Sequence, residues 1–236
     1  NVLRFQGFFE EALLLYKKAL KLAPGNANTL YNIACLYHKI NRFDEAVLSF
    51  EKCLAIDENN TSAIHLLAAL KGETTVTAPE QYIVELFDEY AQTFETNLVR
   101  TLGYNVPAKA YEILIDNLPD KKHQFKRLLD LGCGTGLGGL EFKGIADELI
   151  GIDLSASMLE IANSHNIYND LHRTEICTFL RENDQTYDLL ISCDVFIYIG
   201  DLNDTFEKIT MRSQKGAYFI FSTESSDKSP YYLQKS

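Results

Sequence analysis

Residues 128–139 read Leu-Leu-Asp-Leu-Gly-Cys-Gly-Thr-Gly-Leu-Gly-Gly, and this stretch decides the fold. A short apolar run follows the basic and polar residues 121–127, which predicts a buried strand. Glycine then recurs at every second position from Gly132 to Gly138. A strand that feeds a glycine-rich turn and then a helix is how doubly wound α/β proteins build a nucleotide crevice. The glycines let the backbone approach a ligand closely.

The glycine pattern alone fits two classes of cofactor, because residues 134–139 also satisfy the dinucleotide pattern G-x-G-x-x-G. Asp130 favours a ligand without phosphate, since a carboxylate at the strand end would repel a pyrophosphate and attract the ammonium and sulfonium of S-adenosylmethionine. The string Leu-Asp-Leu-Gly-Cys-Gly-Thr-Gly resembles motif I of class I S-adenosylmethionine-dependent methyltransferases. The resemblance implies a Rossmann-like fold and cofactor binding by Asp130, Gly132, Cys133, Gly134 and Gly136.

A second acidic residue lies where an adenosine ligand would need it. The mainly apolar run 147–153 predicts a second strand that ends in Asp153, 21 residues after the first glycine of the turn. A carboxylate there accepts hydrogen bonds from both ribose hydroxyls. Dinucleotide enzymes use the same arrangement, so this position predicts adenosine without choosing between the two cofactor classes. Ser155 suits the N-cap of the next helix, and the resemblance implies that Leu154 and Met158 contact the adenosine.

Two further strand ends carry candidate site residues. The third strand is expected to end within residues 171–176, where related enzymes have an acid that accepts the adenine amino group. By that resemblance Glu175 is the acceptor and Ile176 offers its backbone N–H to the ring. Residues 187–196 predict the fourth strand and resemble motif IV, which implies that Asp194 faces the methyl group and the substrate.

The fifth strand is expected at residues 216–222, and only 14 residues follow it. The complete family fold has two more strands after this point, one of them antiparallel. We therefore expect that the core, residues 126–236, lacks the last strands of the family fold. The segment after the fifth strand often lines the substrate pocket in related enzymes.

A helical segment with aromatic side chains precedes the core. Residues 82–102 have helical periodicity, and the stretch F-D-x-Y-A-x-x-F-E at residues 87–95 resembles the helix that closes over the cofactor in small-molecule methyltransferases. The resemblance makes Tyr90 and Phe94 candidates for pocket contacts. Aromatic residues at helical spacing also simply pack against a domain, so both interpretations stay open. Lid helices are expected over residues 80–118.

Methyl transfer from a sulfonium is an in-line displacement that needs aligned reactants and exclusion of water, but no protein nucleophile. An amine or hydroxyl acceptor can require a general base. The candidates for this catalytic role are Asp194, Tyr90 and Tyr198.

The first part of the chain has an internal repeat. Residues 27–60 span 34 residues and resemble a tetratricopeptide repeat, with residues 6–26 repeating its second half in register. Gly7 then corresponds to Asn41, and residues 61–71 begin a third copy. The positions that match the repeat are Leu30, Ile33, Ala34, Tyr37, Phe43, Ala46, Phe50, Leu54 and Ile56. Such repeats bind peptides or proteins, so the resemblance implies a protein partner.

Together these patterns predict an α/β chain in which an all-α tetratricopeptide-repeat domain precedes a doubly wound Rossmann-like methyltransferase domain. We expect the repeats at residues 1–71 and the methyltransferase domain at residues 80–236. Residues 72–79 are small and polar and end in proline, which is typical of a linker.

Charge and cysteine content exclude several classes of function. Residues 72–236 carry 14 Lys and Arg against 26 Asp and Glu, which argues against nucleic acid as a substrate. The five cysteines form no C-x-x-C pair and no metal-ligand spacing with histidine, so we expect reduced thiols, no metal and a cytoplasmic protein. No apolar run of 18 residues and no signal-peptide pattern occurs, so no membrane role is expected. Nothing indicates the oligomeric state.

Three functions remain open. The first is an S-adenosylmethionine-dependent methyltransferase whose repeats recruit a protein. The second is a repeat-based interaction or scaffold protein whose transferase domain binds the cofactor without turnover. The third is an NAD-dependent oxidoreductase, disfavoured by Asp130 and by the lack of a recognisable Tyr-x-x-x-Lys or His-Asp pair. The repeats favour a protein acceptor and the lid helix a small molecule. The order of repeats and methyltransferase resembles bacterial proteins of unassigned substrate.

Overall fold

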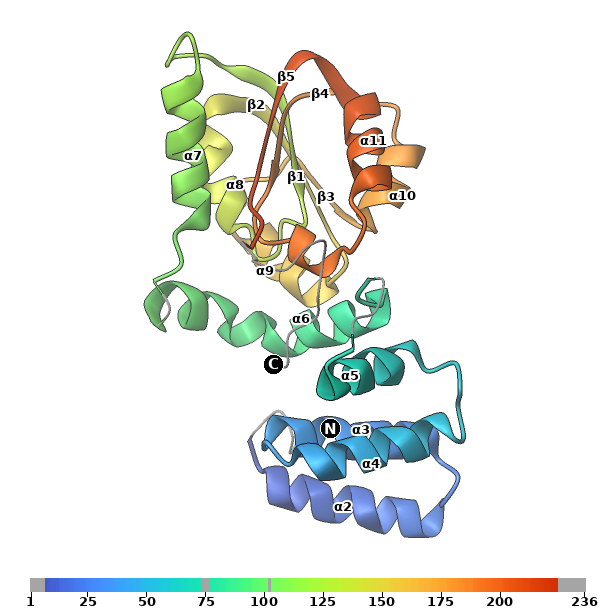
Figure 1. The fold of residues 1–236 in the computed structure, drawn as a ribbon. Helices are drawn as coiled ribbons and strands as arrows, with labels where there is room; N and C mark the ends of the chain where they lie inside the picture. Colours follow the sequence, from blue (N-terminus) through green and yellow to red (C-terminus); the bar gives the residue numbers. More distant parts are fainter. Residues whose placement is uncertain (1–6, 74–76, 102, 225–236) are drawn as a thin grey trace. The chain divides into compact units, whose positions relative to one another are not determined.

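The computed structural model describes residues 7–73, 77–101 and 103–224. The chain divides into two compact units, with Tyr82 in the first and Ile83 at the start of the second (Figure 1). The first unit is helical and the second is built on a parallel sheet. The expected fold class is therefore confirmed. The boundaries expected at residues 71–80 stay a prediction, and residues 74–76 of that linker lie outside the described residues.

The first unit consists of helices that pair along the sequence, and α3 packs against both α2 and α4. Its helices are α2 (Phe9–Leu22), α3 (Ala27–Lys39), α4 (Phe43–Leu54) and α5 (Thr61–Lys71). Their shared core is lined by small and large apolar side chains. The buried members are Ala12, Leu13, Leu30, Ile33, Ala34, Leu36, Tyr37, Ala46, Phe50, Cys53, Ala63, Leu66 and Leu67.

The 34-residue period of the sequence is visible in how the helices begin. The Asn26 side chain accepts a hydrogen bond from the Thr29 N–H at 2.8 Å, which caps α3. The Asn60 side chain, 34 positions later, accepts from the Ala63 N–H at 2.9 Å and caps α5. Each cap satisfies a backbone donor that a helix leaves unpaired at its first turn.

The turn positions follow the same period. Gly7 and Asn41 both have positive φ, 82° and 60°, and Asn tolerates this conformation better than most residues. Two of the repeat-matching residues are not in the core, because Phe43 is 43% exposed and Ile56 is 48% exposed. Phe43 is the first residue of α4 and lies edge-on to the His38 ring, while Ile56 lies beyond the helix end. Phe43 and Ile56 therefore match the repeat in sequence without being buried in its core.

The second unit contains a five-stranded sheet in the order β3-β2-β1-β4-β5, with all pairs parallel. Its strands are β1 (Phe125–Leu131), β2 (Ala146–Asp153), β3 (Asp170–Arg173), β4 (Tyr187–Ser192) and β5 (Ser213–Phe221). The strand order reverses between β1 and β4. In such sheets ligands bind at the carboxyl ends of the strands beside this reversal. The expected strands are confirmed, although β4 ends earlier and β5 begins earlier than expected.

Different helices cover the two faces of the sheet (Figure 1), and alternating side chains of the strands pack beneath them. Leu128 and Leu189 join the core with α7, whereas Leu129 and Leu190 join the core with α10 and α11. This alternation is the two-residue period of a strand covered on both sides. The covering helices are α7 (Val106–Asn117) and α8 (Leu137–Phe142) on one face, and α10 (Ile176–Glu182) and α11 (Asn203–Arg212) on the other.

Helix α6 (Glu80–Glu95) precedes the sheet and continues into a π-helix, η1 (Thr96–Thr101). Helix α9 (Ala156–Ser164) follows β2, and short 3-10 turns occur as η2 (Lys143–Ile145) and η3 (Phe196–Tyr198). The helix expected over residues 82–102 is thus confirmed up to residue 101, and Leu102 lies outside the described residues. The expected lack of further strands concerns residues 223–236, of which 225–236 lie outside them as well.

Candidate cofactor and acceptor site

The turn between β1 and α8 is packed too tightly for any residue but glycine at its first position. Gly132 has a φ of 70°, and a Cβ added there would lie 2.4 Å from a methyl carbon of Val195. The Ser192 hydroxyl donates to the Leu131 carbonyl at 3.1 Å and fixes the end of β4 against the end of β1. The turn therefore lies against the loop that follows β4.

Tyr168, which the sequence did not suggest, supports this turn from within. A Cβ added at Gly139 would lie 2.4 Å from the Tyr168 hydroxyl, and one added at Gly151 would lie 2.8 Å from its ring. The hydroxyl donates to Asp130 Oδ2 at 2.7 Å. Glycines in α8 and in β2 thus make room for a tyrosine that precedes β3. A single sequence contains no pattern that pairs these segments.

Asp130 is buried beneath the turn, with 2% of its surface exposed. Burial raises its pKa to about 7. The Tyr168 hydroxyl and the Gly139 N–H favour the charged form and act in the opposite direction. The electrostatic argument from the sequence treated it as an open carboxylate at the strand end. The structure instead shows a buried carboxyl group that accepts from the Tyr168 hydroxyl, and direct contact with a cofactor stays a prediction.

Asp153, unlike Asp130, is partly exposed at the end of β2. Its two oxygens accept from the Gly134 N–H at 2.9 Å and from the Ser155 N–H at 2.8 Å. Burial raises its pKa, and these backbone donors act in the opposite direction. Each carboxylate oxygen retains a second lone pair, so the group can still accept from two hydroxyls.

The other candidate residues of the glycine turn and of the segment after β2 differ in how far they are buried. Cys133 is buried and its N–H donates to the Ile152 carbonyl at 2.9 Å, which joins the turn to β2. Gly136 has a φ of 94° at the start of α8. Leu154 is partly exposed, whereas Met158 is 1% exposed. The Met158 side chain belongs to the core, and its contact with adenosine stays a prediction.

Glu175 lies at the end of β3, as expected, and caps the next helix. Its two oxygens accept from the Cys177 N–H at 2.8 Å and the Thr178 N–H at 2.7 Å. Ile176 is the first residue of α10, where helix N–H groups have no partner within the helix. Its side chain is buried in the core between the sheet and α10. The carboxylate keeps free lone pairs, so the adenine contact stays a prediction.

Asp194 follows β4 in a conformation unusual for aspartate, with a φ of 58°. Its N–H donates to the Ser222 hydroxyl at 2.7 Å, and that hydroxyl donates to Asp194 Oδ1 at 2.6 Å. Tyr104, from the segment after η1, lies close to the Asp194 carboxylate. Burial, followed by the neighbouring Asp194 carboxylate, raises the Tyr104 pKa. The sequence identified Asp194 but neither of these two neighbours.

The two tyrosine candidates lie in one aromatic cluster without facing each other directly. The Phe87 ring on α6 lies 5.4 Å from Tyr198 and 6.1 Å from Phe94, measured between ring centroids. Tyr90 packs edge-on to Phe94 at 6.5 Å and is 43% exposed. The structure thus connects Tyr198 to α6 through Phe87, which the sequence did not single out.

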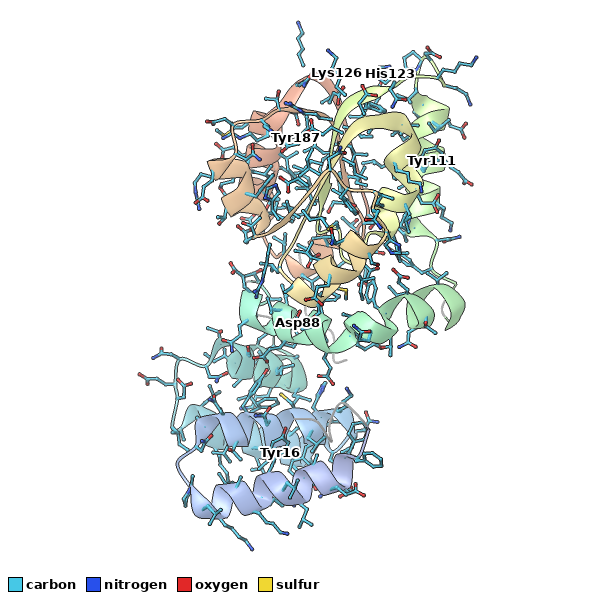
Figure 2. All side chains as sticks on the ribbon, turned by 180° about the vertical axis from the view of Figure 1, so that it is seen from behind. Tyr16, Asp88, Tyr111, His123, Lys126 and Tyr187 are labelled. Atoms are coloured by element: carbon cyan, nitrogen blue, oxygen red, sulfur yellow. The ribbon has the colours of Figure 1, made fainter. Side chains whose placement is uncertain are left out.

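Helix α6 is also bonded to the loop of Asp153. Asp88, labelled on this helix in Figure 2, accepts from the Ser155 hydroxyl at 2.5 Å and from the Ser157 N–H at 3.3 Å. At the other end of α9, His165 Nε2 lies 3.2 Å from a Glu95 carboxylate oxygen. The expected N-cap at Ser155 is confirmed, and Asp88 was missed.

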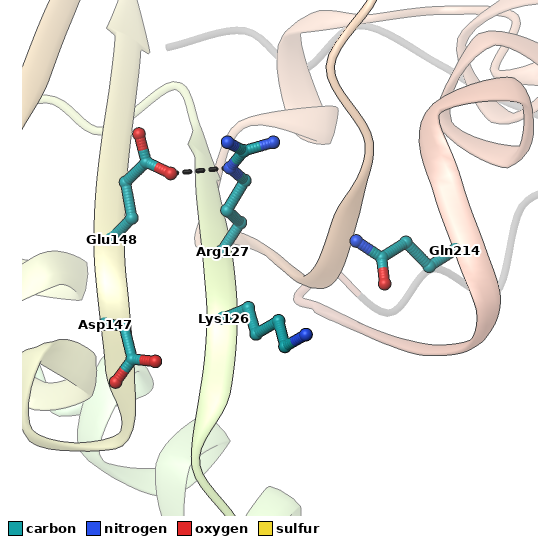
Figure 3. Close-up of a pocket in the computed structure, with 5 residues that line it drawn as sticks. All are labelled: Lys126, Arg127, Asp147, Glu148 and Gln214. Carbon is teal, nitrogen blue, oxygen red and sulfur yellow. Dashed lines mark hydrogen bonds and ion pairs between the residues drawn. The ribbon is translucent and has the colours of Figure 1, made fainter.

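A surface pocket lies at the opposite ends of the strands, away from these residues (Figure 3). Its lining residues lie near the starts of three strands: Lys126 and Arg127 in β1, Asp147 and Glu148 in β2, and Gln214 in β5. The Arg127 guanidinium pairs with Glu148 at 2.5 Å. The pocket contains no turn glycine and none of the candidate site residues, so it is not the cofactor site.

Among residues 7–73, 77–101 and 103–224 no cluster of His, Cys, Asp and Glu has the arrangement of a metal site. Within the same part of the chain, no helix combines the length and the apolar character that crossing a membrane requires.

Comparisons with known proteins agree with this geometry. A family model described as a methyltransferase domain matches residues 104–235, and one described as a tetratricopeptide repeat matches residues 1–59. The ubiquinone biosynthesis O-methyltransferase of Bartonella quintana is 28% identical over 80 residues, 33% of this chain and 32% of that protein. The protein of the same name from Rhodopseudomonas palustris strain BisB5 is 32% identical over 78 residues, 32% of this chain and 31% of that protein.

The matched region spans about a third of the length of these curated relatives. Among solved structures, the one described as "DhpI-SAH complex structure" has a TM-score of 0.51 at 18% identity, covering 60% of this chain and 67% of that chain. This likeness supports the fold. The methyltransferase family model covers more than half of the chain, and the matched region includes the glycine turn, Asp153 and the parallel sheet. The chain therefore belongs to the S-adenosylmethionine-dependent methyltransferase family and carries tetratricopeptide repeats before its methyltransferase domain.

Proposed function

We propose that this chain binds S-adenosylmethionine beside the β1 turn and transfers its methyl group to an acceptor held near Asp194 and the aromatic face of α6. The observation that carries the proposal is the contact between Asp153 and the Gly134 N–H, because it joins the ribose-binding acid to the glycine turn. Asp153 and the glycine turn, joined in this way, would offer carboxylate acceptors to the ribose and leave space beside the backbone for the rest of the cofactor.

The residues present suit this cofactor. A Cβ added at Gly134 would meet nothing within 4 Å, so the turn has open space beside its backbone for a bound molecule. Asp153 would accept from the ribose hydroxyls, and Glu175 would accept from the adenine amino group with its remaining lone pairs. Ile176, at the first position of α10, would present its N–H to the adenine ring.

When bound, the cofactor supplies an electrophilic methyl group on a positive sulfur. The chain then has to orient the acceptor and exclude water. Asp194 would accept the proton of an acceptor hydroxyl or amine, while Ser222 holds its carboxylate in place and Tyr104 lies close to it. Tyr90, Tyr198 and their phenylalanine neighbours would provide the apolar wall against which the acceptor lies.

The names of the curated relatives favour a hydroxyl group on a small molecule as the acceptor. We propose that the repeat unit binds a peptide or protein partner, as the repeats of this kind do. For the boundaries we propose repeats at residues 1–71, a linker at residues 72–79 and the methyltransferase domain at residues 80–236. No nucleic acid is proposed as a partner.

A methyl-transfer assay tests this function. The purified chain is incubated with S-adenosylmethionine carrying a labelled methyl group and with catechols, phenols and primary amines in separate reactions. We expect label in the product of at least one hydroxyl compound and a loss of at least about tenfold in rate for Asp194→Asn. Cofactor binding without transfer to any hydroxyl or amine would favour a scaffold role and contradict the proposal.

A further inference from the structure

Asp88 on α6 and Asp153 at the end of β2 share one residue as a hydrogen-bond partner. The Ser155 N–H donates to Asp153 Oδ1 at 2.8 Å, and the Ser155 hydroxyl donates to Asp88 Oδ1 at 2.5 Å. Asp88 also accepts from the Ser157 N–H at 3.3 Å. A carboxylate from a helix 67 residues earlier in the chain therefore fixes the loop that presents the ribose-binding acid.

The Ser155 side chain has little freedom to do anything else. It is buried, with 1% of its surface exposed, and its oxygen accepts from the Met158 N–H at 3.1 Å as the N-cap of α9. With that lone pair in use, its single O–H points to Asp88. Asp88 also places negative charge at the positive end of α9, which is favourable. Burial strengthens hydrogen bonds of this kind.

A second contact joins α6 to α9. Glu95, at the last position of α6, lies 3.2 Å from Nε2 of His165, the residue that caps the end of α9. Both ends of α9 are therefore bonded to side chains of α6. Of the contacts made by Asp88 and by Glu95, the one made by Asp88 reaches the loop that follows Asp153.

The same arrangement places two carboxylates near each other. The charge of Asp88 is one of the causes that raise the Asp153 pKa, after burial. Repulsion between the two is offset by the donors of Ser155, and hydroxyl donors from a ribose on Asp153 would offset it further. A ligand that supplies these ribose hydroxyls therefore stabilises the position in which Asp88 of α6 is bonded to Ser155. By reciprocity, α6 held in this docked position tightens binding of the ligand.

We propose that Asp88 is a positioning residue of the cofactor site, which acts through Ser155 on Asp153 and couples the docking of α6 to ribose binding. This inference rests on the proposed function, because it assumes that Asp153 binds the ribose of the cofactor. It assigns to Asp88 a role in cofactor affinity without direct contact with the cofactor.

Calorimetric titration with S-adenosylhomocysteine tests the inference on the whole chain. We expect Asp88→Ala to raise the Kd about tenfold, and Asp88→Asn, which keeps an acceptor oxygen, to raise it no more than about threefold. Ser155→Ala removes the hydroxyl from the other side and should act like Asp88→Ala. Glu80→Ala is the matched control, since it removes an acid from the first turn of the same helix.

A double-variant cycle separates positioning from general loss of structure. In an Asp153→Ala background Asp88→Ala should change the Kd less than about twofold, because its effect passes through Asp153. An Asp88→Ala Kd equal to that of Glu80→Ala, or equal effects of Asp88→Ala in both backgrounds, would overturn the inference while the proposed function stood. A wild-type chain that binds no S-adenosylhomocysteine would overturn the proposed function and this inference with it.

Discussion

A buried carboxyl group with a raised pKa makes stability depend on pH in a predictable direction. The Asp130 pKa is about 7 in the folded chain and 3.8 without burial, so between these values the folded state binds more protons than the unfolded state. Its contribution favours folding at low pH and is lost as the pH rises through 7. Asn cannot ionise, yet it keeps an oxygen that can accept from Tyr168.

We therefore expect Asp130→Asn to lose less stability than the wild type between pH 5 and pH 8, by on the order of 2 kcal/mol. Urea unfolding at the two pH values measures this difference. Asp116→Asn, at an exposed pair with Lys121, serves as the control and should follow the wild type. Parallel pH profiles for the wild type and Asp130→Asn would show that Asp130 is ionised in the folded chain.

The packing of Tyr168 against the glycine turn predicts an unequal response of two glycines to alanine. Gly139→Ala would bring a methyl group to 2.4 Å from the Tyr168 hydroxyl, whereas a Cβ at Gly144 meets nothing within 4 Å. We expect Gly139→Ala to lower the free energy of unfolding by about 2 kcal/mol and Gly144→Ala to leave it nearly unchanged. Equal effects of the two substitutions in chemical denaturation would contradict this packing.

At the scale of single elements, the repeat helices depend on their caps. Asn60→Ala removes the side-chain acceptor at the start of α5 and Asn26→Ala removes the equivalent acceptor of α3. Each should lower the stability of the unit by about 1 kcal/mol. The exposed Asn59 is a suitable control. Thermal unfolding followed by circular dichroism measures the effect, and a loss for Asn59→Ala as large as for Asn60→Ala would contradict the assignment of the cap.

The elements that sequence could predict are those whose evidence is local. An apolar run followed by alternating glycines predicts the β1 turn. The place of Asp153 at the end of the next strand predicts its role. The sequence did not predict the roles of Tyr168, Tyr104 and Asp88, because these roles depend on contacts between distant segments. Tyr168 lies 38 positions from Asp130 in the chain, and Asp88 lies 67 from Ser155. No periodicity in either segment specifies such a pairing.

At the scale of the whole molecule, a repeat unit and a methyltransferase unit are carried by one chain. The parallel sheet places the ends of β1, β2, β3 and β4 at one edge, which brings together acids that are far apart in sequence. Motif spacing was therefore enough to predict which strand ends supply the candidate site. The acceptor was not predictable, because the contacts proposed for it come from α6, η3 and the segment around Tyr104, whose packing only the structure shows.

The central claim is that Asp153 and the glycine turn bind S-adenosylmethionine, and calorimetric titration of the purified chain with S-adenosylhomocysteine and with NADH tests it most directly. We predict binding of S-adenosylhomocysteine, none of NADH, and a Kd at least about 30-fold higher for Asp153→Ala, which removes both ribose acceptors. Asp147→Ala, at the other end of the same strand, should bind like the wild type. Binding of NADH alone, or an unchanged Kd in Asp153→Ala, would contradict the claim.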